Sequence, residues 1–218
     1  MLSEYRAIYE GGQGEIVEKK SRFIATVKEI ESEEDALEFI ENTKKKYWDA
    51  RHNCFAYVLG ERHETARFSD DGEPGGTAGK PMLDVLLGED IHNAAVVVTR
   101  YFGGTLLGTG GLVRAYSGAV KEGLANSTVI TKTAGVHLYI ETDYTGLGKI
   151  QYILGEQKIA IMDSVYTDKV ELTAMVPTEN LGKIKSDLIE GTNARAVLTE
   201  GDACYFAEIE GEVVIFEK

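Results

Sequence analysis

This chain of 218 residues contains little cysteine, little proline and no long apolar run. Its two cysteines, Cys54 and Cys204, are too few and too far apart for a disulfide framework, so we expect two buried free thiols. Three prolines argue against long disordered linkers. Because no eighteen consecutive residues are apolar and the first residues lack the pattern of a signal peptide, the sequence predicts a soluble, cytoplasmic protein.

An excess of basic residues is also missing. The chain has 23 Lys and Arg against 36 Asp and Glu, a net charge of −13, which residues 1–127 (−6) and 128–218 (−7) share. This balance argues against a broad basic surface for duplex DNA, but it leaves room for a local basic patch. Loops of the first half supply four residues for such a patch: Arg51, Lys80, Arg100 and Arg114.

The first half alternates between strand and helix patterns. Strands are predicted within residues 14–30, on either side of a turn at Lys19–Ser21, and over His52–Leu59, Thr65–Ser69 and Ala94–Thr99. Helices are predicted after an N-cap at Ser32, over Gly79–Leu87 and from about Thr109 to Asn126. Leu37 and Leu87 are expected on the buried sides of the first two helices. The pattern predicts an α+β domain in which helices pack on a sheet.

The second half reads as β-α-β-β-α-β after a polar, β-branched segment, Asn126–Ala134, that is expected to be a linker. Asp143 or Thr142 is the expected cap of its first helix and Thr178 that of its second. A strand over Ala194–Leu198 and a terminal hairpin about Gly211 complete the pattern. This order is that of a ferredoxin-like domain, so we predict two α+β domains, residues 1–130 and 131–218.

Two glycine-rich loops, residues 69–81 and 99–111, stand out in the centre of the chain. The first is not a P-loop, because Pro74 replaces the first glycine of that motif and Pro81 replaces its hydroxyl residue. The second is not a dinucleotide-binding fingerprint, because Val113 stands where the third glycine is needed. Both standard nucleotide motifs are therefore excluded, and no cofactor is expected.

Less specific anion binding remains open at the second loop, which leads into a predicted helix N-terminus with free amides. Arg100 and Arg114 would supply fixed charge there, and His52 and Lys80 would lie nearby. The alternative is that the glycines only let the loop fold tightly against the sheet. The loop glycines that belong to the candidate site are Gly103, Gly104, Gly110 and Gly111.

Acidic residues cluster in the first loop at Asp70, Asp71 and Glu73. Carboxylates beside glycines suit a hard cation, but these lack the spacing of a calcium loop, so capping or solvated roles are favoured. The four histidines have no metal-ligand spacing, and we predict no metal site. Catalytic residues stay unassigned, because no nucleophile, base and orienting group can be assembled from the sequence.

The same central segments resemble the Impact family, and in particular its bacterial YigZ-like branch. The resemblance is carried by residues 20–25 (KSRFIA), 50–57 (ARHNCFAY), 69–81 (SDDGEPGGTAGKP) and 98–104 (VTRYFGG) through Arg114-Ala115-Tyr116. These ordered motifs cover most of residues 15–125.

The resemblance implies an N-terminal domain like the second domain of a small-subunit ribosomal protein and a C-terminal domain similar to one in elongation factor G. Eukaryotic members regulate translation under stress and carry a different additional domain that this chain lacks. Bacterial members have no settled activity, and a fold alone does not supply one.

These observations favour a non-enzymatic regulator or accessory factor that contacts RNA, the ribosome or a translation protein. The expected surface combines Arg51, His52 and Arg100 with Lys80, Arg114 and the loop glycines. Two alternatives stay open: an enzyme that acts on a small phosphorylated or anionic substrate, with an acid of the first loop as base or metal ligand, and an interaction scaffold that uses its acidic C-terminal sheet.

Overall fold

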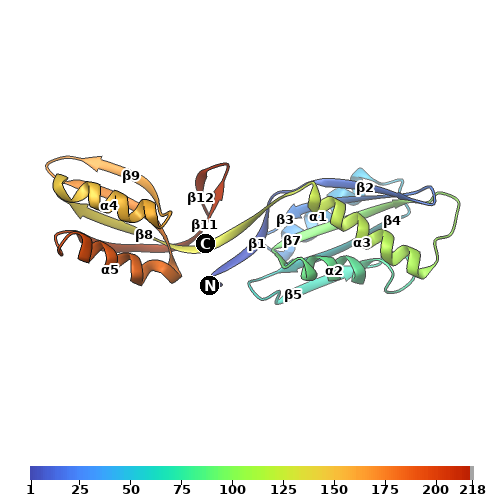
Figure 1. Cartoon of the computed structure of the whole chain (residues 1–218). Helices are drawn as coiled ribbons and strands as arrows, with labels where there is room; N and C mark the ends of the chain where they lie inside the picture. Colours follow the sequence, from blue (N-terminus) through green and yellow to red (C-terminus); the bar gives the residue numbers. More distant parts are fainter. Residues whose placement is uncertain (217–218) are drawn as a thin grey trace. The chain divides into compact units, whose positions relative to one another are not determined.

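The computed structural model describes residues 1–216, which form two compact units. The N-terminal unit is Tyr5–Thr131, and the C-terminal unit combines Met1–Glu4 with the chain from Lys132 onward. Strands and helices are interleaved in both (Figure 1). The predicted α+β, two-domain fold class is therefore confirmed. No helix within residues 1–216 combines the length and apolarity needed to cross a lipid bilayer.

The N-terminal unit is built on a five-stranded antiparallel sheet in the order β2-β3-β7-β4-β5. Its strands are β2 (Gln13–Glu18), β3 (Ser21–Glu29), β4 (His52–Leu59), β5 (Thr65–Ser69) and β7 (Ala94–Tyr101). The predicted turn at Lys19–Ser21 joins β2 to β3, and Thr65–Ser69 is the hairpin partner of β4 as predicted. A second, parallel pair joins β1 (Glu4–Glu10) to β6 (Ile91–His92), which the sequence did not predict because both strands are short or weakly alternating.

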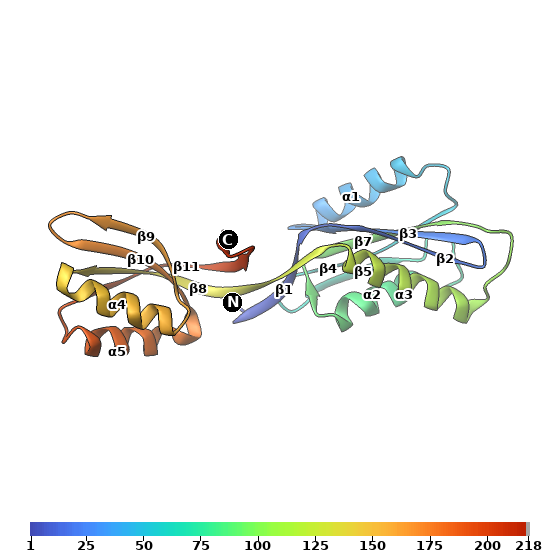
Figure 2. The same cartoon turned by 45° about the horizontal axis from the view of Figure 1, so that its top comes forward.

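Helices cover both faces of the five-stranded sheet (Figure 2). On one face α2 (Gly79–Gly88) and α3 (Thr109–Ala125) bury Met82, Leu86 and Tyr116 against apolar side chains of β3, β4 and β7. On the other face α1 (Glu33–Lys46) buries Ala36, Phe39 and Ile40 against the opposite side of β4 and β7. The double cover explains why β7 is apolar on both sides, as a strand buried on both faces must be.

Two details of these helices differ from expectation. Leu37 is 53% exposed and Leu87 is 38% exposed, so neither belongs to the core. Phe39 takes the place predicted for Leu37, because the buried stripe of α1 continues through residues 36, 39, 40 and 43. The predicted N-cap is confirmed: the Ser32 hydroxyl accepts the backbone N–H of Asp35 at 3.1 Å.

The C-terminal unit has the predicted β-α-β-β-α-β order. An antiparallel sheet runs β9-β10-β8-β11-β12, and two helices bury Ile150, Leu154, Ile184 and Leu188 on one face of it. The elements are β8 (Thr128–Thr142), α4 (Tyr144–Glu156), β9 (Ala160–Tyr166), β10 (Val170–Pro177), α5 (Leu181–Gly191), β11 (Val197–Ile209) and β12 (Glu212–Phe216). Asp143, not Thr142, caps α4 by accepting the Gly146 N–H at 2.7 Å.

Three sequence predictions for this half need correction. Residues 126–134 do contain the division between the two units, at Thr131 and Lys132, but they are not irregular, because β8 begins at Thr128. Thr178 does not cap a helix directly; a short 3-10 turn, Thr178–Asn180, precedes α5, whose start has no side-chain cap. The last long strand begins at Val197 and continues to Ile209, well beyond the predicted Leu198.

Candidate anion-binding site

One cleft in the N-terminal unit gathers residues from both glycine-rich loops and from the ends of β4 and β7. Its volume is about 410 Å³. The antiparallel register brings Arg100 of β7 opposite Phe23 on β3 and opposite His52 on β4, on the same side of the sheet as α3. The cleft is lined by Arg51, His52, Glu73, Pro74, Arg100, Phe102, Leu106, Leu107, Gly108, Thr109 and Leu112.

A buried ion pair forms the polar wall of the cleft. Arg100 is 6% exposed and Glu73 is 8% exposed, and Arg100 Nη1 donates to Glu73 Oε1 at 2.6 Å. The Tyr116 hydroxyl donates to the same oxygen at 2.8 Å. A charge that is removed from water needs such partners, because an unpaired buried charge is strongly destabilising. Glu73 is therefore neutralised by its neighbours and does not give the cleft a negative charge.

The Arg100 guanidinium has further contacts and one vacant donor. It lies 5.4 Å from the Phe23 ring centroid and 5.6 Å from that of Phe102, within the range of cation–π attraction. Its Nε is buried and has no hydrogen-bond partner within residues 1–216. A buried donor without a partner costs about 1–3 kcal/mol, so an acceptor that reaches it would stabilise this wall.

The start of α3 adds positive potential to the cleft. Gly108 precedes the helix with φ of 74°, a backbone conformation that favours glycine, and no side chain caps the first turn. No acidic residue lies in that turn. The first amides of a helix have no intrahelical acceptor, and the macrodipole places about half a positive charge there. Thr109 at this end lines the cleft, so the free amides lie beside it.

Arg51 and His52 complete the cleft. Arg51 is exposed and forms no ion pair within the described residues. The Asp71 carbonyl oxygen can only accept, so His52 Nδ1–H donates to it at 2.8 Å, and this bond orients the ring. Two arginines thus face one carboxylate, and the cleft has a local positive excess in a chain of net charge −13.

The acids of the first loop hold that loop together. Asp70 accepts the backbone N–H groups of Gly76, Ala78 and Gly79 at 2.8, 3.0 and 2.8 Å, which anchors the start of α2. Asp71 accepts the Asn53 N–H at 2.7 Å and pairs with Lys44 at 3.4 Å. Both carboxylates are therefore committed to the protein's own donors, as the capping interpretation of these residues expects.

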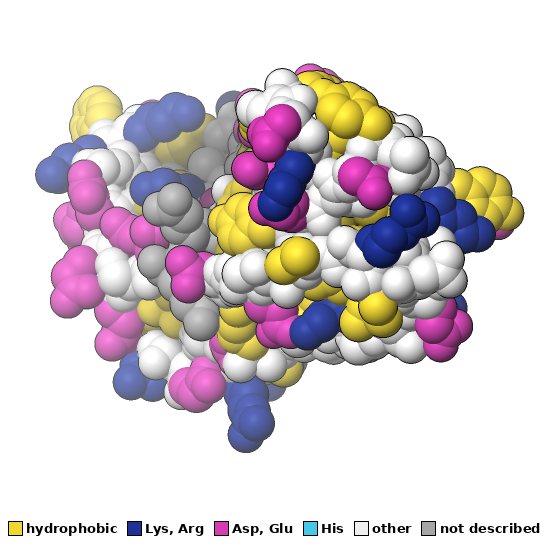
Figure 3. Space-filling view, turned by 90° about the vertical axis from the view of Figure 1, so that its left-hand side faces the viewer, with side chains coloured by type: hydrophobic (Ala, Val, Ile, Leu, Met, Phe, Trp, Pro, Cys, Tyr) yellow, Lys and Arg dark blue, Asp and Glu magenta, His cyan; other side chains and the backbone are white. Residues whose placement is uncertain are grey.

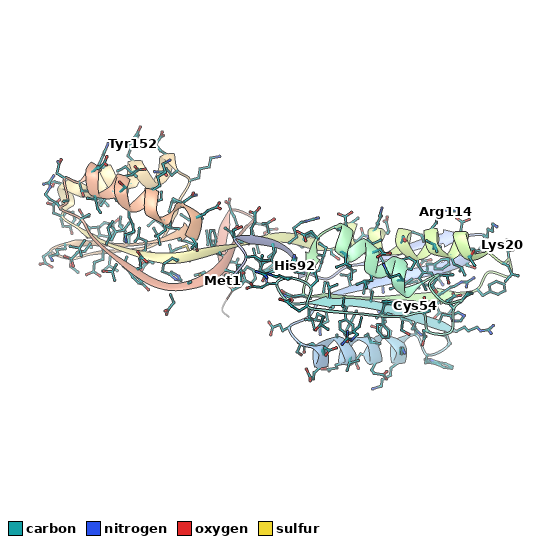
Figure 4. The ribbon with its side chains drawn as sticks, turned by 90° about the horizontal axis from the view of Figure 1, so that it is seen from below. Met1, Lys20, Cys54, His92, Arg114 and Tyr152 are labelled. Carbon is teal, nitrogen blue, oxygen red and sulfur yellow. The ribbon has the colours of Figure 1, made fainter. Side chains whose placement is uncertain are left out.

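Other predicted site residues lie outside the cleft. Lys80 is on the exposed side of α2 and pairs with Asp84 one turn later. Arg114 is exposed on the side of α3 that faces away from the sheet (Figure 4). Gly103 lies against the β2–β3 turn, where its N–H donates to the Ser21 hydroxyl at 3.0 Å. Gly104, Gly110 and Gly111 belong to the loop and the first turn of α3 but do not line the cleft.

The apolar lining was not predicted. Phe102, Leu106 and Leu107 give the cleft an apolar wall, and Leu106 is 82% exposed. The sequence did hold a signal for this wall, because these three large apolar residues stand in a loop of otherwise small ones. An exposed cluster of apolar residues marks a binding surface more often than a single exposed residue does.

The thiol at the back of this region is not a nucleophile. Burial raises the pKa of Cys54 to about 12, and its Sγ donates to the Asp70 carbonyl at 3.0 Å. Burial also raises the pKa of Tyr116, with the nearby Cys54 and Glu73 adding to the effect. Both groups stay protonated at neutral pH, so they support the ion pair and do not attack a substrate.

Two histidines that the sequence did not connect meet elsewhere in the N-terminal unit. The rings of His63 and His92 stack with centroids 4.0 Å apart and planes 27° apart, and His92 Nε2 lies 3.2 Å from Asp90 Oδ1. The three side chains offer atoms within 4.8 Å of one another. However, imidazole lone pairs lie in the ring plane, so two nearly parallel rings do not direct theirs at one metal ion. Their contacts with the Ile91 and Gly60 carbonyls instead join β6 to the turn between β4 and β5.

Two domain families match the chain: the Impact N-terminal domain over residues 19–124 and a domain of unknown function, DUF1949, over residues 140–195. The IMPACT family member YvyE of Bacillus subtilis (strain 168) is 41% identical over 94% of this chain and 94% of its own length. YigZ of Escherichia coli (strain K12) is 40% identical over 79% of this chain and 85% of its own.

A eukaryotic protein and a solved structure are also similar to this chain. The IMPACT homolog of Saccharomyces cerevisiae is 32% identical over 43% of this chain and 37% of that protein. A crystal structure described as that of a hypothetical protein matches with a TM-score of 0.59 at 34% identity, covering 93% of this chain and 99% of the other. Because the bacterial similarity extends over both domains at about 40% identity, this chain belongs to the Impact family and has the two-domain form of its bacterial members YvyE and YigZ.

Proposed function

We propose that this protein is a non-enzymatic accessory factor of translation that contacts RNA through the cleft of its N-terminal unit. The observation that carries the proposal is the local positive excess of the cleft in a chain of net charge −13. A net negative charge keeps nonspecific nucleic-acid binding low, so a cationic cleft confines phosphate contacts to one place on the protein.

The chemistry of the cleft suits single-stranded RNA. Arg51 and the amides at the start of α3 are donors for phosphate oxygens. Phe102, 54% exposed, offers an aromatic face on which an unpaired base can stack. Membership in the Impact family supports a role in translation, because the family resemblance links its eukaryotic members to translation regulation.

An enzyme with an acidic base or metal ligand in the first loop finds less support. A general base needs a free lone pair within reach of a substrate proton. Asp70 and Asp71 accept from backbone amides, and Glu73 Oε1 already accepts from Arg100 and Tyr116.

The proposal is tested by fluorescence anisotropy with a short single-stranded RNA, together with co-sedimentation with ribosomes, at low and at physiological salt. Binding should weaken as salt increases. Arg51→Ala should weaken RNA binding by at least about tenfold, since a charge-assisted hydrogen bond contributes about 1.5–3 kcal/mol. Arg51 is exposed, so this variant should keep the wild-type stability.

Two variants serve as controls. Arg62→Ala removes the same charge from an exposed turn outside the cleft and should bind like the wild type. Arg114→Ala removes a charge from the outer side of α3 and should have a smaller effect than Arg51→Ala. Absence of RNA and ribosome binding by the wild type at low salt would contradict the proposal.

A further inference from the structure

We infer that the cleft holds a terminal phosphate monoester carried on a nucleotide, and not an internal phosphodiester of the RNA backbone. The inference rests on the proposed function, because it names the part of an RNA strand that enters the cleft. A phosphate monoester offers three terminal oxygens and a charge of about −1.5 to −2 at neutral pH. A phosphodiester offers two free oxygens and one charge.

The donors around the cleft are as many in origin as the three terminal oxygens of a phosphate monoester. They come from three separate places: the guanidinium of Arg51 before β4, the unpartnered Nε of Arg100 on β7, and the amides of the first turn of α3. Donors from three elements around one cleft suit a group with three terminal oxygens better than one with two. Since Arg100 is 94% buried by the surrounding protein, it is held in place before any ligand arrives.

The negative group in the cleft does not oppose this binding. Glu73 is the one carboxylate among the described lining residues, and its Oε1 already accepts from Arg100 Nη1 and the Tyr116 hydroxyl. Arg100 therefore carries the charge that balances Glu73, and Arg51 with the α3 terminus remains to meet the ligand.

The size and apolar side of the cleft fit one nucleotide. A volume of about 410 Å³ lies in the range of small-ligand sites, roughly 300–1,000 Å³. Pro74 of the first loop lies on its wall together with Leu106 and Leu107 of the second, so the cleft is bounded by both loops. The exposed Phe102 and Leu106 would cover the sugar and base once the phosphate is in place.

The same chemistry is found in a phosphorylated RNA end and in a free nucleotide, and one experiment separates them. We would measure anisotropy of two single-stranded RNAs of the same sequence, labelled at the 3′ end, one with a 5′-phosphate and one with a 5′-hydroxyl, and use adenosine monophosphate as a competitor. The 5′-phosphorylated RNA should bind about tenfold more tightly than the 5′-hydroxyl RNA. Arg51→Ala should remove most of this difference, and Arg62→Ala should preserve it.

A second variant tests the apolar wall. Leu106→Ser, at a largely exposed position, should weaken competition by adenosine monophosphate but leave competition by inorganic phosphate unchanged. Equal binding of the two RNAs would overturn the inference and leave the proposed function standing. Binding of adenosine monophosphate without RNA binding would support the monoester site and contradict the RNA role. If neither ligand binds, both proposals are overturned.

Discussion

Arg100 shows how a single residue on a buried strand acquires a role at a surface. It follows the apolar run and Thr99 on β7, lies opposite Phe23 of β3 and lines the cleft. Burial of an arginine is favourable only with a carboxylate partner, and the first loop supplies it from 27 residues earlier in the chain. The pair thus joins the loop, the strand and α3 at one point.

Replacing Glu73 by Gln should destabilise the N-terminal unit by about 3 kcal/mol, because it leaves the Arg100 charge buried without a counter-charge. The amide keeps the shape and can still accept from Tyr116. Urea unfolding followed by circular dichroism measures the change. As a control, Asp84→Asn breaks the exposed ion pair with Lys80 and should lower the free energy of unfolding by less than about 1 kcal/mol. An equal loss of unfolding free energy in the two variants would contradict the role given to the buried pair.

Cys54 gives the stability of the protein a dependence on alkaline pH. Burial raises the pKa of the folded thiol to about 12, while an unfolded thiol titrates near about 8.5. Below about pH 8.5 the thiol keeps its proton in both the folded and the unfolded state. Between about pH 8.5 and about pH 12 only the unfolded chain loses the thiol proton. The resulting stabilisation is therefore present at neutral pH and is lost as pH rises toward 12, by up to about 1.4 kcal/mol per pH unit.

Cys54→Ala lacks this contribution. The difference in unfolding free energy between wild type and variant should therefore shrink by roughly 2 kcal/mol between about pH 8.5 and about pH 10. Urea titrations at a series of pH values measure it. Parallel stability curves for the two proteins would show that the thiol does not titrate on unfolding as described.

In the first glycine-rich loop, an acid and a glycine together fix the start of helix α2. Asp70 caps the start of α2 from outside the helix, since the residue before it, Ala78, has no capping side chain. Gly79 must lack a side chain, because a Cβ there would lie 2.8 Å from the Ser69 carbonyl carbon. The loop is therefore held in shape by contacts within the N-terminal unit.

Asp70→Ala should destabilise the N-terminal unit by about 2 kcal/mol, because three backbone N–H groups lose their acceptor. Hydrogen exchange should show lost protection at Ala78 and Gly79 before the rest of α2. Asp84→Ala on the same helix serves as the control and should change protection at these amides little. Unchanged exchange in Asp70→Ala would contradict the capping role.

The whole molecule has two separate cores and a dispersed charge. The core clusters of the sheet with α1, α2 and α3 lie within the N-terminal unit, and the cluster around Leu138, Leu154 and Leu172 lies within the C-terminal unit. On the face drawn in Figure 3, acidic and basic side chains are interspersed with apolar ones. The negative net charge is spread over both halves of the chain, and the cationic cleft is a local exception.

Separate cores predict separate unfolding. Calorimetry should resolve two transitions, and Leu172→Ala, at a fully buried position, should lower only one of them by removing about 2–5 kcal/mol from the C-terminal unit. Leu86→Ala, equally buried in the N-terminal unit, should lower only the other. A single transition that both variants lower alike would show that the two cores unfold together.

Local patterns were enough to predict most helices and strands. The amphipathic spacing of apolar residues and the Ser32 cap predicted α1. Alternating apolar and polar residues predicted the strands of the second half and with them its ferredoxin-like order. Both signals lie within a few residues of one another along the chain. Errors fell where local patterns were weak: Leu37 was expected in the core, and residues 126–134, which contain the division between the units, were not recognised as the start of strand β8.

The cleft depended on contacts that no local pattern contains. Arg51, His52 and Arg100 could be named from composition and motifs, but their meeting with Glu73 requires the antiparallel register of β4 and β7. That same packing leaves Arg114 and Lys80 outside the lining of the cleft and brings Leu106 into it. Residue type and short-range periodicity are properties of the chain, whereas side-chain convergence follows from long-range packing, which only the tertiary structure supplies.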